Sequence, residues 1–401
     1  GRAWPSGSRN PRTIGRGGSQ ITFTYQKFGA GMRWIFLTVI VLLFELFTYG
    51  AGRGLQWWAG SWLSDRSSRY LMIGLFVVSN ALLVFGIARL TSFGLKLSMT
   101  WLTILWFVIM SMVVVGIINL VLMKVAPQFF NAVSYQIYGQ RILLPFMFFG
   151  MILMGIYNAY TPTIRYITLT ANQPLAKPIR IGMVSDLHLG LMVGDRQINR
   201  LTDMVKAQNV QLLLMPGDIM DDNVDYYTSQ NMQPALQQLA SAVPMGAYAT
   251  LGNHDMYGHE GEIRDAIKKA NITLLADDKI LVDNQLWLVG RLDNHATYRK
   301  ATKDLMPSST DKPIILLDHE PNEIEQNVQL PIDLQVSGHT HNGQIFPANF
   351  IVKFLNRLGY GYERINNTDV IVSSGYGFWG VPFRLGSQAE LWVIDLVGKK
   401  S

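Results

Sequence analysis

The chain has 401 residues, of which 49% are hydrophobic and none is cysteine. This length exceeds one typical domain, so we expect two or three folded units. The lack of cysteine excludes disulfides, thiolate metal ligands and cysteine nucleophiles, and any metal ion must therefore be held by His, Asp, Glu or Asn side chains.

Charge divides the chain into two parts of opposite sign. Residues 1–160 contain 13 Lys and Arg but only two acidic residues, whereas residues 161–401 contain 21 basic and 26 acidic residues. The net charge of +6 is therefore the sum of +11 and −5. The positive charges flank long apolar segments, as they do at the ends of membrane helices, so we expect no nucleic-acid partner.

The first 31 residues are rich in Gly, Arg and Ser and show no apolar periodicity. Such a composition cannot bury enough apolar surface to fold. We expect residues 1–31 to be a disordered basic tail or an added N-terminal extension, and we assign them no function.

Residues 32–160 contain four apolar segments that are long enough to cross a bilayer, which requires roughly 20 helical residues. Four such helices in succession are more than a domain of this size could cover, so we predict a multi-pass transmembrane bundle. Both ends of the bundle then lie on the same side, and the downstream Lys177 and Arg180 favour a cytoplasmic catalytic domain. The segments are residues 34–50, 70–90, 100–125 and 142–160.

The pattern changes after Tyr160. Residues 161–177 contain two prolines and alternate polar with apolar residues, which predicts an extended linker over residues 161–178. From residue 179 to 401, short β-rich runs alternate with amphipathic stretches, so this part is predicted to be one α/β domain. The expected helices are residues 195–208, 230–242 and 260–270, and the expected strands are residues 179–184, 210–215, 247–251, 286–290, 314–317, 334–336, 370–373 and 390–395.

Five polar clusters follow predicted strands, and this placement is the most informative feature of the sequence. Residues i and i+2 of an extended chain point to the same side, so a DxH or HxH motif presents two ligands to one place. A shared metal site satisfies all these buried polar groups at once, whereas separate core histidines would each need their own partners. The clusters are SDLHLG from Ser185, PGDIMD from Pro216, LGNHD from Leu251, LLDHEP from Leu316 and SGHTHNG from Ser337.

The clusters supply seven donor side chains, which is too many for one tetrahedral ion and suits two ions that share a carboxylate. Nitrogen and oxygen donors without sulfur favour Mn, Fe or Zn over Mg or Ca. We therefore expect two divalent metal ions as cofactors. The predicted ligands are Asp186, His188, Asp218, Asn253, His319, His339 and His341.

The series DxH, GDxxD, GNHD, a later His and GHxH, in this order, resembles the calcineurin-like metallophosphoesterases. The resemblance implies an α/β fold, the four-layer αββα sandwich, with two metal ions at the strand ends. It also implies the distribution of ligands. The first metal would take Asp186, His188, Asp218 and His341, and the second would take Asp218, Asn253, His319 and His339.

The resemblance further implies the roles of residues next to the metals. His254 would contact the phosphate and assist the leaving group, with Asp255 orienting it, while Asp221 would support the loop rather than bind metal. Two dications lower the pKa of a shared water, so a hydroxide is available near neutral pH to attack the phosphorus.

Beyond the last motif the chain reads SSGYGFWGVPFRLGS, a glycine-rich aromatic segment. It is similar to the tail of the membrane-associated subgroup that includes YkuE-type and UDP-diacylglucosamine hydrolase-type enzymes. We predict Arg384, Tyr376 and Trp379 as substrate contacts, with Arg384 pairing a phosphate. Packing of the aromatic residues on the core is the alternative.

The sequence thus predicts a membrane-anchored phosphodiesterase or pyrophosphatase that acts on a phosphorylated small molecule or a lipid-linked or nucleotide-linked substrate. A phosphomonoesterase or protein phosphatase on the same site is one alternative. A membrane sensor or scaffold with a non-catalytic, ligand-binding domain is another, although such a protein has no need of His254 beside a full ligand set.

Overall fold

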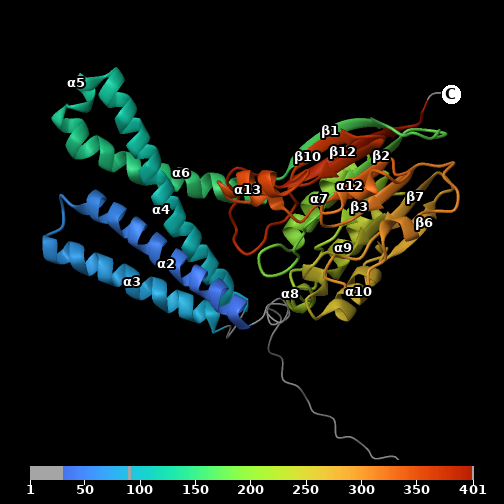
Figure 1. Cartoon of the computed structure of the whole chain (residues 1–401), viewed down its shortest axis with the longest axis horizontal. Helices are drawn as coiled ribbons and strands as arrows, with labels where there is room; N and C mark the ends of the chain where they lie inside the picture. Colours follow the sequence, from blue (N-terminus) through green and yellow to red (C-terminus); the bar gives the residue numbers. More distant parts are fainter. Residues whose placement is uncertain (1–29, 89–91, 400–401) are drawn as a thin grey trace, which may run out of the picture.

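The computed structural model describes residues 30–88 and 92–399. Within them the chain forms a helical bundle followed by a layered α/β domain, and the two lie end to end (Figure 1). The predicted basic tail, residues 1–31, falls almost entirely outside the described residues.

Four long helices form the bundle: α2 (Ala30–Ala59), α3 (Asp65–Ile87), α4 (Ser92–Val125) and α6 (Gln140–Tyr160), with α5 (Pro127–Phe130) and the π-helix η1 (Tyr135–Gly139) between the last two. All four are long and apolar enough to cross a membrane, with mean hydropathies of 1.3 to 2.6. Only 17 to 28% of each apolar window is buried inside the protein. The outward-facing apolar surface therefore requires a lipid environment.

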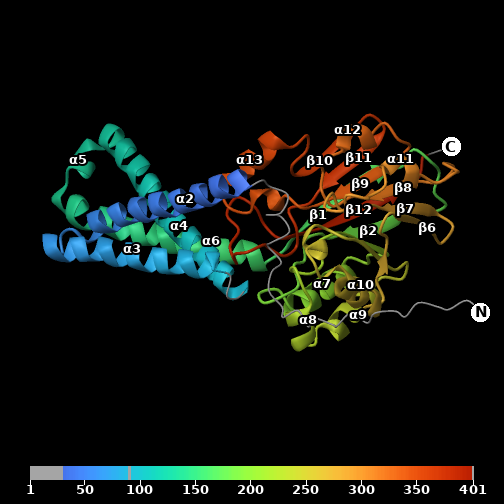
Figure 2. The same cartoon turned by 60° about the horizontal axis from the view of Figure 1, so that its bottom comes forward.

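The α/β domain contains two six-stranded sheets (Figure 2). The strand orders are β1-β12-β2-β3-β4-β5 and β10-β11-β9-β8-β7-β6. In each sheet the central strands run parallel, and β12 pairs antiparallel with β2. The strands are β1 (Thr163–Thr170), β2 (Ile179–Met183), β3 (Leu212–Pro216), β4 (Ala247–Thr250), β5 (Thr273–Leu274), β6 (Asp278–Val282), β7 (Leu286–Gly290), β8 (Ile314–Leu317), β9 (Leu334–Ser337), β10 (Gly361–Ile365), β11 (Thr368–Val372) and β12 (Glu390–Val397).

Apolar clusters separate the layers of this domain. One cluster lies between the sheets and joins residues such as Ile181 and Leu214 to Leu288 and Val336. A second joins the first sheet to α7, α9 and α10, and two smaller ones cover the outer face of the second sheet. The predicted α/β, four-layer αββα class is confirmed. The helices are α7 (Asp195–Ala207), α8 (Asp225–Ser229), α9 (Gln233–Ser241), α10 (Glu260–Lys269), α11 (Thr302–Leu305), α12 (Ile324–Asn327) and α13 (Ala348–Leu355), with 3₁₀ turns η2 (His254–Met256) and η3 (His341–Gly343).

The segment 161–178, which we expected to be an extended linker, instead contributes an edge strand. Strand β1 pairs in parallel with β12 along its whole length, from Thr163 to Thr170. Pro162 and Pro174 lie just outside this strand, where the missing N–H groups cost no ladder hydrogen bond. The last membrane helix therefore passes directly into the first sheet.

A second connection joins the bundle to the domain near the end of the chain. Phe383 packs on Phe107 of α4, with ring centroids 5.6 Å apart, and lies against Gly155 of α6. The backbone N–H of Arg384 donates to the Gly155 carbonyl at 2.9 Å. The segment after β11 thus contacts both α4 and α6. These contacts fix the domain relative to the bundle.

Candidate metal centre

The predicted ligands converge because each follows a strand at the same edge of the two sheets. Strands β2, β3 and β4 of the first sheet, and β8 and β9 of the second, all end just before a predicted ligand. Because the carboxyl ends of parallel strands meet at one edge, five loops bring their side chains together there.

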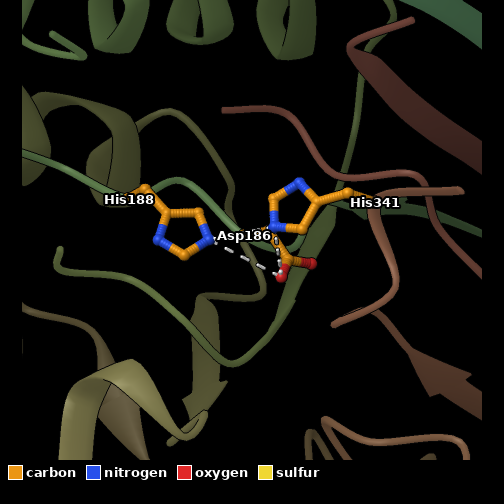
Figure 3. Close-up of side chains that lie close together, drawn as sticks. All are labelled: Asp186, His188 and His341. Atoms are coloured by element: carbon orange, nitrogen blue, oxygen red, sulfur yellow. Dashed lines mark hydrogen bonds and ion pairs between the residues drawn. The ribbon is translucent and has the colours of Figure 1, made fainter. Parts of the chain in front are cut away.

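Three of the side chains form a first cluster (Figure 3). The Nε2 atoms of His188 and His341 lie 3.1 Å apart. Oδ1 of Asp186 lies 3.4 Å from Nε2 of His341 and 3.9 Å from Nε2 of His188. Two imidazole nitrogens and a carboxylate oxygen thus point at one buried place, which is a suitable donor set for a divalent cation.

A second cluster lies beside the first and contains Asp218, His319 and His339. Oδ1 of Asn253 lies 3.1 Å from Nε2 of His319 and 3.0 Å from Nδ1 of His339. Nδ1 of His319 is 2.8 Å from the Pro216 carbonyl, an arrangement that leaves Nε2 facing the cluster. All four predicted ligands of the second metal therefore lie together.

Asp218 lies between the two clusters. Its Oδ2 is 3.1 Å from Nε2 of His319 and 3.7 Å from Nε2 of His188. Its Oδ1 accepts a hydrogen bond from the backbone N–H of His254 at 2.9 Å. One carboxylate thus reaches both groups of imidazoles.

The backbone at the site is strained. Five of the seven predicted ligands, all non-glycine residues, have φ between 49° and 69°. Left-handed conformations of this kind cost about 1–3 kcal/mol each and persist only where the surrounding structure enforces them. Gly252 is also required locally, because a Cβ atom there would lie 2.1 Å from Oδ1 of Asp218. The five residues are Asp186, His188, Asp218, His339 and His341.

Charges within the site separate the histidines into two kinds. Burial opposes a charged His319, but Asp218 and Asp186 outweigh burial and hold the pKa of His319 well above its usual range. The pKa of His341 lies well below its usual range, because burial, His188 and Arg384 all disfavour the imidazolium. His341 is therefore neutral and ready to donate a lone pair, whereas His319 must lose a proton before it can do so.

Asp221 connects the first cluster to the membrane bundle. It forms an ion pair with Lys96 of α4, and its Oδ1 lies 3.7 Å from Nδ1 of His188. In the part of the chain that the structure describes, that Nδ1 has no hydrogen-bond partner. A ligating histidine normally has its second nitrogen oriented by a carboxylate, and Asp221 occupies this position. Asp221 also forms, with His188 and His254, a group of atoms close enough to hold a metal ion, so its expected role in supporting the loop stays a prediction.

His254 lies beside both clusters. Its ring centroid is 5.0 Å from that of His188, and its Nδ1 is 2.6 Å from Oδ1 of Asp222. Burial alone would lower the pKa of His254, but the charge of Asp218 and the hydrogen bond with Asp222 raise it to about 9. In the metal-free protein His254 is therefore protonated at neutral pH.

The expected role of Asp255 needs correction. Its carboxylate is fully buried and accepts hydrogen bonds from the backbone N–H groups of Ile219, Met220 and Gly252 at 2.9 to 3.1 Å. These bonds join the loop after β3 to the loop after β4. Asp222, and not Asp255, contacts the His254 ring, because Asp255 points back into the domain.

Two of the three predicted substrate contacts, Arg384 and Tyr376, are buried in the structure, whereas that of Trp379 stays a prediction. Arg384 is fully buried and donates to the carbonyls of Ser374 and Gly377, and its Nη2 lies 3.2 Å from Nδ1 of His341. It lies behind the predicted ligand His341 and, because it is buried, cannot reach a phosphate. Tyr376 is 4% exposed and donates to the Gln197 carbonyl, so it is a packing residue.

Trp379 alone of these three is open to solvent, with 40% of its surface exposed. Its ring centroid lies 5.8 Å from that of His254. Tyr257, which we did not predict, lies on the other side of His254 with centroids 5.0 Å apart, and its hydroxyl accepts from Nδ2 of Asn253 at 2.6 Å. Tyr257 follows His254 by three residues, or one helical turn, and this spacing is the signal that could have identified it.

Comparison with known proteins assigns the domain. Residues 179–343 match the family model described as calcineurin-like phosphoesterase. An uncharacterized metallophosphoesterase of Helicobacter pylori (strain J99) is 31% identical over 232 residues, which are 56% of this chain and 61% of that protein. One of Campylobacter jejuni is 29% identical over 70% of this chain and 75% of its own length.

A vertebrate protein is similar to the same extent. The Danio rerio "transmembrane protein with metallophosphoesterase domain" is 30% identical over 54% of this chain and 53% of its own length. The chain thus spans between about half and three quarters of these relatives. The expected calcineurin-like metallophosphoesterase domain is confirmed.

Proposed function

We propose that the chain is a membrane-anchored phosphoesterase that hydrolyses a phosphodiester or pyrophosphate bond with the help of two divalent metal ions. The position of Asp218 carries the proposal. A carboxylate whose Oδ2 lies 3.1 Å from one imidazole cluster and 3.7 Å from another is placed to serve two cations at once.

The donor set fits such a pair of ions. Asp186, His188 and His341 would hold the first and Asn253, His319 and His339 the second, with Asp218 shared between them. Nitrogen and oxygen donors favour Mn, Fe or Zn. When bound, two dications supply an activated water and neutralise the charge of the phosphoryl oxygens.

The protein's own contribution centres on His254. Its Nδ1 is held by Asp222 at 2.6 Å, so Nε2 is the nitrogen that would deliver a proton to a departing oxygen. General acid assistance of this kind contributes typically ~10²–10⁴-fold. A binding-only domain would have no use for this group.

A phosphodiester, or a pyrophosphate that is esterified at both phosphoryl groups, suits the charges near the site better than a phosphomonoester. The basic side chains that reach the ligand loops already have partners. Lys96 pairs with Asp221, Arg384 contacts backbone carbonyls, and Arg291 pairs with Asp318 and Glu323. A diester carries one negative charge on its phosphoryl group, whereas a monoester carries close to two and needs more positive charge.

We further propose a cytoplasmic catalytic domain and membership of the YkuE-type or UDP-diacylglucosamine hydrolase-type subgroup. Four crossings put both ends of the bundle on the catalytic side, and the basic residues that follow the last helix, Arg165, Lys177 and Arg180, favour the cytoplasm. Protease protection of the domain in sealed right-side-out vesicles tests this orientation, and cleavage from outside contradicts it.

A substrate panel tests the activity. The detergent-solubilised protein is stripped with a chelator, reloaded with Mn, Zn or Mg, and assayed with bis-aryl and mono-aryl phosphates. We expect faster turnover of the bis-aryl phosphate, since it is the singly charged substrate. The reverse order would assign a phosphomonoesterase instead.

The matched controls are Asp218→Asn and His254→Ala. Both are expected to abolish most turnover while the thermal unfolding midpoint stays close to that of the parent chain. Unchanged turnover in both variants would contradict catalysis at this site.

A further inference from the structure

Helix α13 presents its apolar side chains outward. Phe354 is 88% exposed, Leu355 71%, Phe350 61% and Ile351 56%. These four residues are spaced at i, i+1, i+4 and i+5, so they form one stripe along the helix. In a water-surrounded domain such a stripe normally faces the core, and here it faces away.

The opposite side of α13 is the side that packs on the domain. Val352 packs closely on Gly359. A Cβ atom added to this glycine would lie 2.7 Å from Cγ1 of Val352. Asn349 lies beside Gly386, with its Cγ atom 3.7 Å from the place that a Cβ atom added to this glycine would take. The helix is therefore fixed in an orientation that leaves most of the apolar stripe exposed, although the ring of Phe350 also contacts that of Phe346.

The position of α13 identifies what covers the stripe. The segment that enters the helix is tied to α4, because the Trp106 indole N–H donates to the Phe346 carbonyl at 2.8 Å. Ile345 packs on the cluster that contains Phe107 of the same helix. Both views place α13 at the end of the bundle nearest the catalytic domain (Figures 1 and 2).

Depth along α4 supports the same conclusion. Trp106 follows Lys96 by ten residues, which is about 15 Å along a helix. Trp106 therefore lies about 15 Å deeper toward the membrane than the charge of Lys96. Tryptophan is enriched at the boundary between headgroups and acyl chains. The stripe of α13 is thus continuous with the lipid-facing surface of the bundle.

We propose that α13 is an interfacial helix whose stripe, Phe350, Ile351, Phe354 and Leu355, inserts into the lipid bilayer. An amphipathic helix with its apolar face toward the acyl chains lies at the headgroup boundary. Lys353 is exposed on the flank, where it can reach lipid phosphates.

The same helix is coupled to the loop that carries two predicted ligands. The Thr340 hydroxyl, between His339 and His341, donates to the Gly359 carbonyl at 2.7 Å, just beyond the end of α13. At the other end of the helix, Gly343 lies close to Asn349. A Cβ atom added to Gly343 would lie 2.3 Å from the backbone nitrogen of Asn349. Insertion of α13 therefore holds the ligand loop at the bilayer surface. If the proposed hydrolysis is correct, this placement assigns the substrate to amphiphilic phosphoesters whose headgroups lie in that surface.

The lack of cysteine makes a direct test of insertion possible. Phe354→Cys is labelled with an environment-sensitive fluorophore and reconstituted in phosphatidylcholine vesicles that contain a quencher on the acyl chain. Leu120→Cys in α4 is the lipid reference, and Tyr298→Cys, a 69% exposed position of the catalytic domain, is the water reference. We expect acyl-chain quenching at least about twofold stronger than for Tyr298→Cys and close to that of Leu120→Cys.

The matched control on the same helix is Lys353→Cys, which we expect to be quenched by iodide in the water. Phe350→Cys and Leu355→Cys repeat the measurement if Phe354→Cys fails to fold. Quenching of the stripe positions by iodide, or equal behaviour of Phe354→Cys and Lys353→Cys, would overturn the proposal. This readout is independent of hydrolysis, so it stands whether or not the proposed function does.

A second measurement tests the substrate class. Phe350→Ser/Phe354→Ser is assayed in vesicles with a bis-aryl phosphate and with the same compound carrying a long alkyl chain. We expect turnover of the alkylated compound to fall about tenfold and that of the soluble compound to change less than about twofold. An equal effect on both compounds would overturn the assignment to amphiphilic substrates, and no turnover of either by the parent chain would refute the hydrolysis alone.

Discussion

Lys96 of the membrane helix α4 forms an ion pair with Asp221 of the catalytic domain, only 17% and 9% of the two side chains being exposed. Helix α4 has 34 residues and is therefore about 51 Å long, which exceeds the roughly 30 Å of the hydrocarbon core. Its first turns can thus project from the bilayer and carry Lys96 to the site. Asp221 in turn lies 3.7 Å from Nδ1 of His188, so a membrane helix supports a predicted metal ligand.

Lys96→Met is expected to weaken binding of the first metal ion about 10–100-fold, as losses of supporting partners around ligands typically do. The substitution leaves Asp221 without its cation, and Asp221 can then no longer orient His188 in the same way. Titration of the chelator-stripped protein with Zn measures the effect. Lys124→Met, at the far end of the same helix, is the control. Equal affinities for both variants would show that the ion pair has no role at the site.

His254→Ala is expected to lower kcat about 10²–10⁴-fold while the metal content stays unchanged, because the ring supplies a proton and no ligand. The charge of Asp218 and the hydrogen bond with Asp222 both raise the pKa of His254; Asp222→Asn removes only the second contribution and should reduce kcat by a smaller factor. The readout is kcat alongside metal content measured by mass spectrometry. Loss of metal from His254→Ala would instead make this residue a ligand.

Asp255→Asn is expected to lower stability rather than to impair chemistry selectively. The carboxylate accepts three backbone N–H groups, and an amide places an N–H₂ donor against at least one of them. A buried donor left without an acceptor costs about 1–3 kcal/mol. The thermal unfolding midpoint should fall accordingly. An unchanged midpoint with a large fall in kcat would restore the catalytic role that we first expected.

Metal affinity is expected to rise with pH through the neutral range. The pKa of His319 in the metal-free protein is held well above its usual range, so at pH 7 the imidazole carries a proton. Binding through Nε2 requires the neutral form, and it must therefore release that proton. Calorimetry in two buffers of different ionisation enthalpy counts the protons released. Binding without proton release would place His319 outside the ligand set.

Residues in strict motifs were predictable from the sequence because each motif follows a buried strand. Asp186 and His188 come after β2 as expected, although their left-handed backbone differs from the extended conformation that we assumed and depends on the surrounding fold. The central strands also matched closely: residues 286–290 and 314–317 were predicted with the bounds that the structure has. Strong β-propensity and burial on both faces made these runs unambiguous.

Residues whose roles depend on tertiary contacts were not predictable. Arg384 resembled a phosphate ligand, but its burial against the His341 loop and the segment between β11 and β12 is invisible in the sequence. Asp222 and Asp255 are both acids near GNHD or GDxxD, and only the fold decides which one meets His254. Strand β1 was interpreted as a linker because its partner, β12, lies more than 200 residues away. In each case the deciding contact joins distant segments.

Metal stoichiometry tests the central claim most directly. The purified protein, stripped with a chelator, is titrated with Mn or Zn, and the bound ions are counted by native mass spectrometry for the parent chain and for Asp218→Asn. We expect about two ions in the parent and at most about one in the variant, since a shared carboxylate holds both. A parent chain that binds less than one equivalent at saturation would contradict a dinuclear centre at this edge of the sheets.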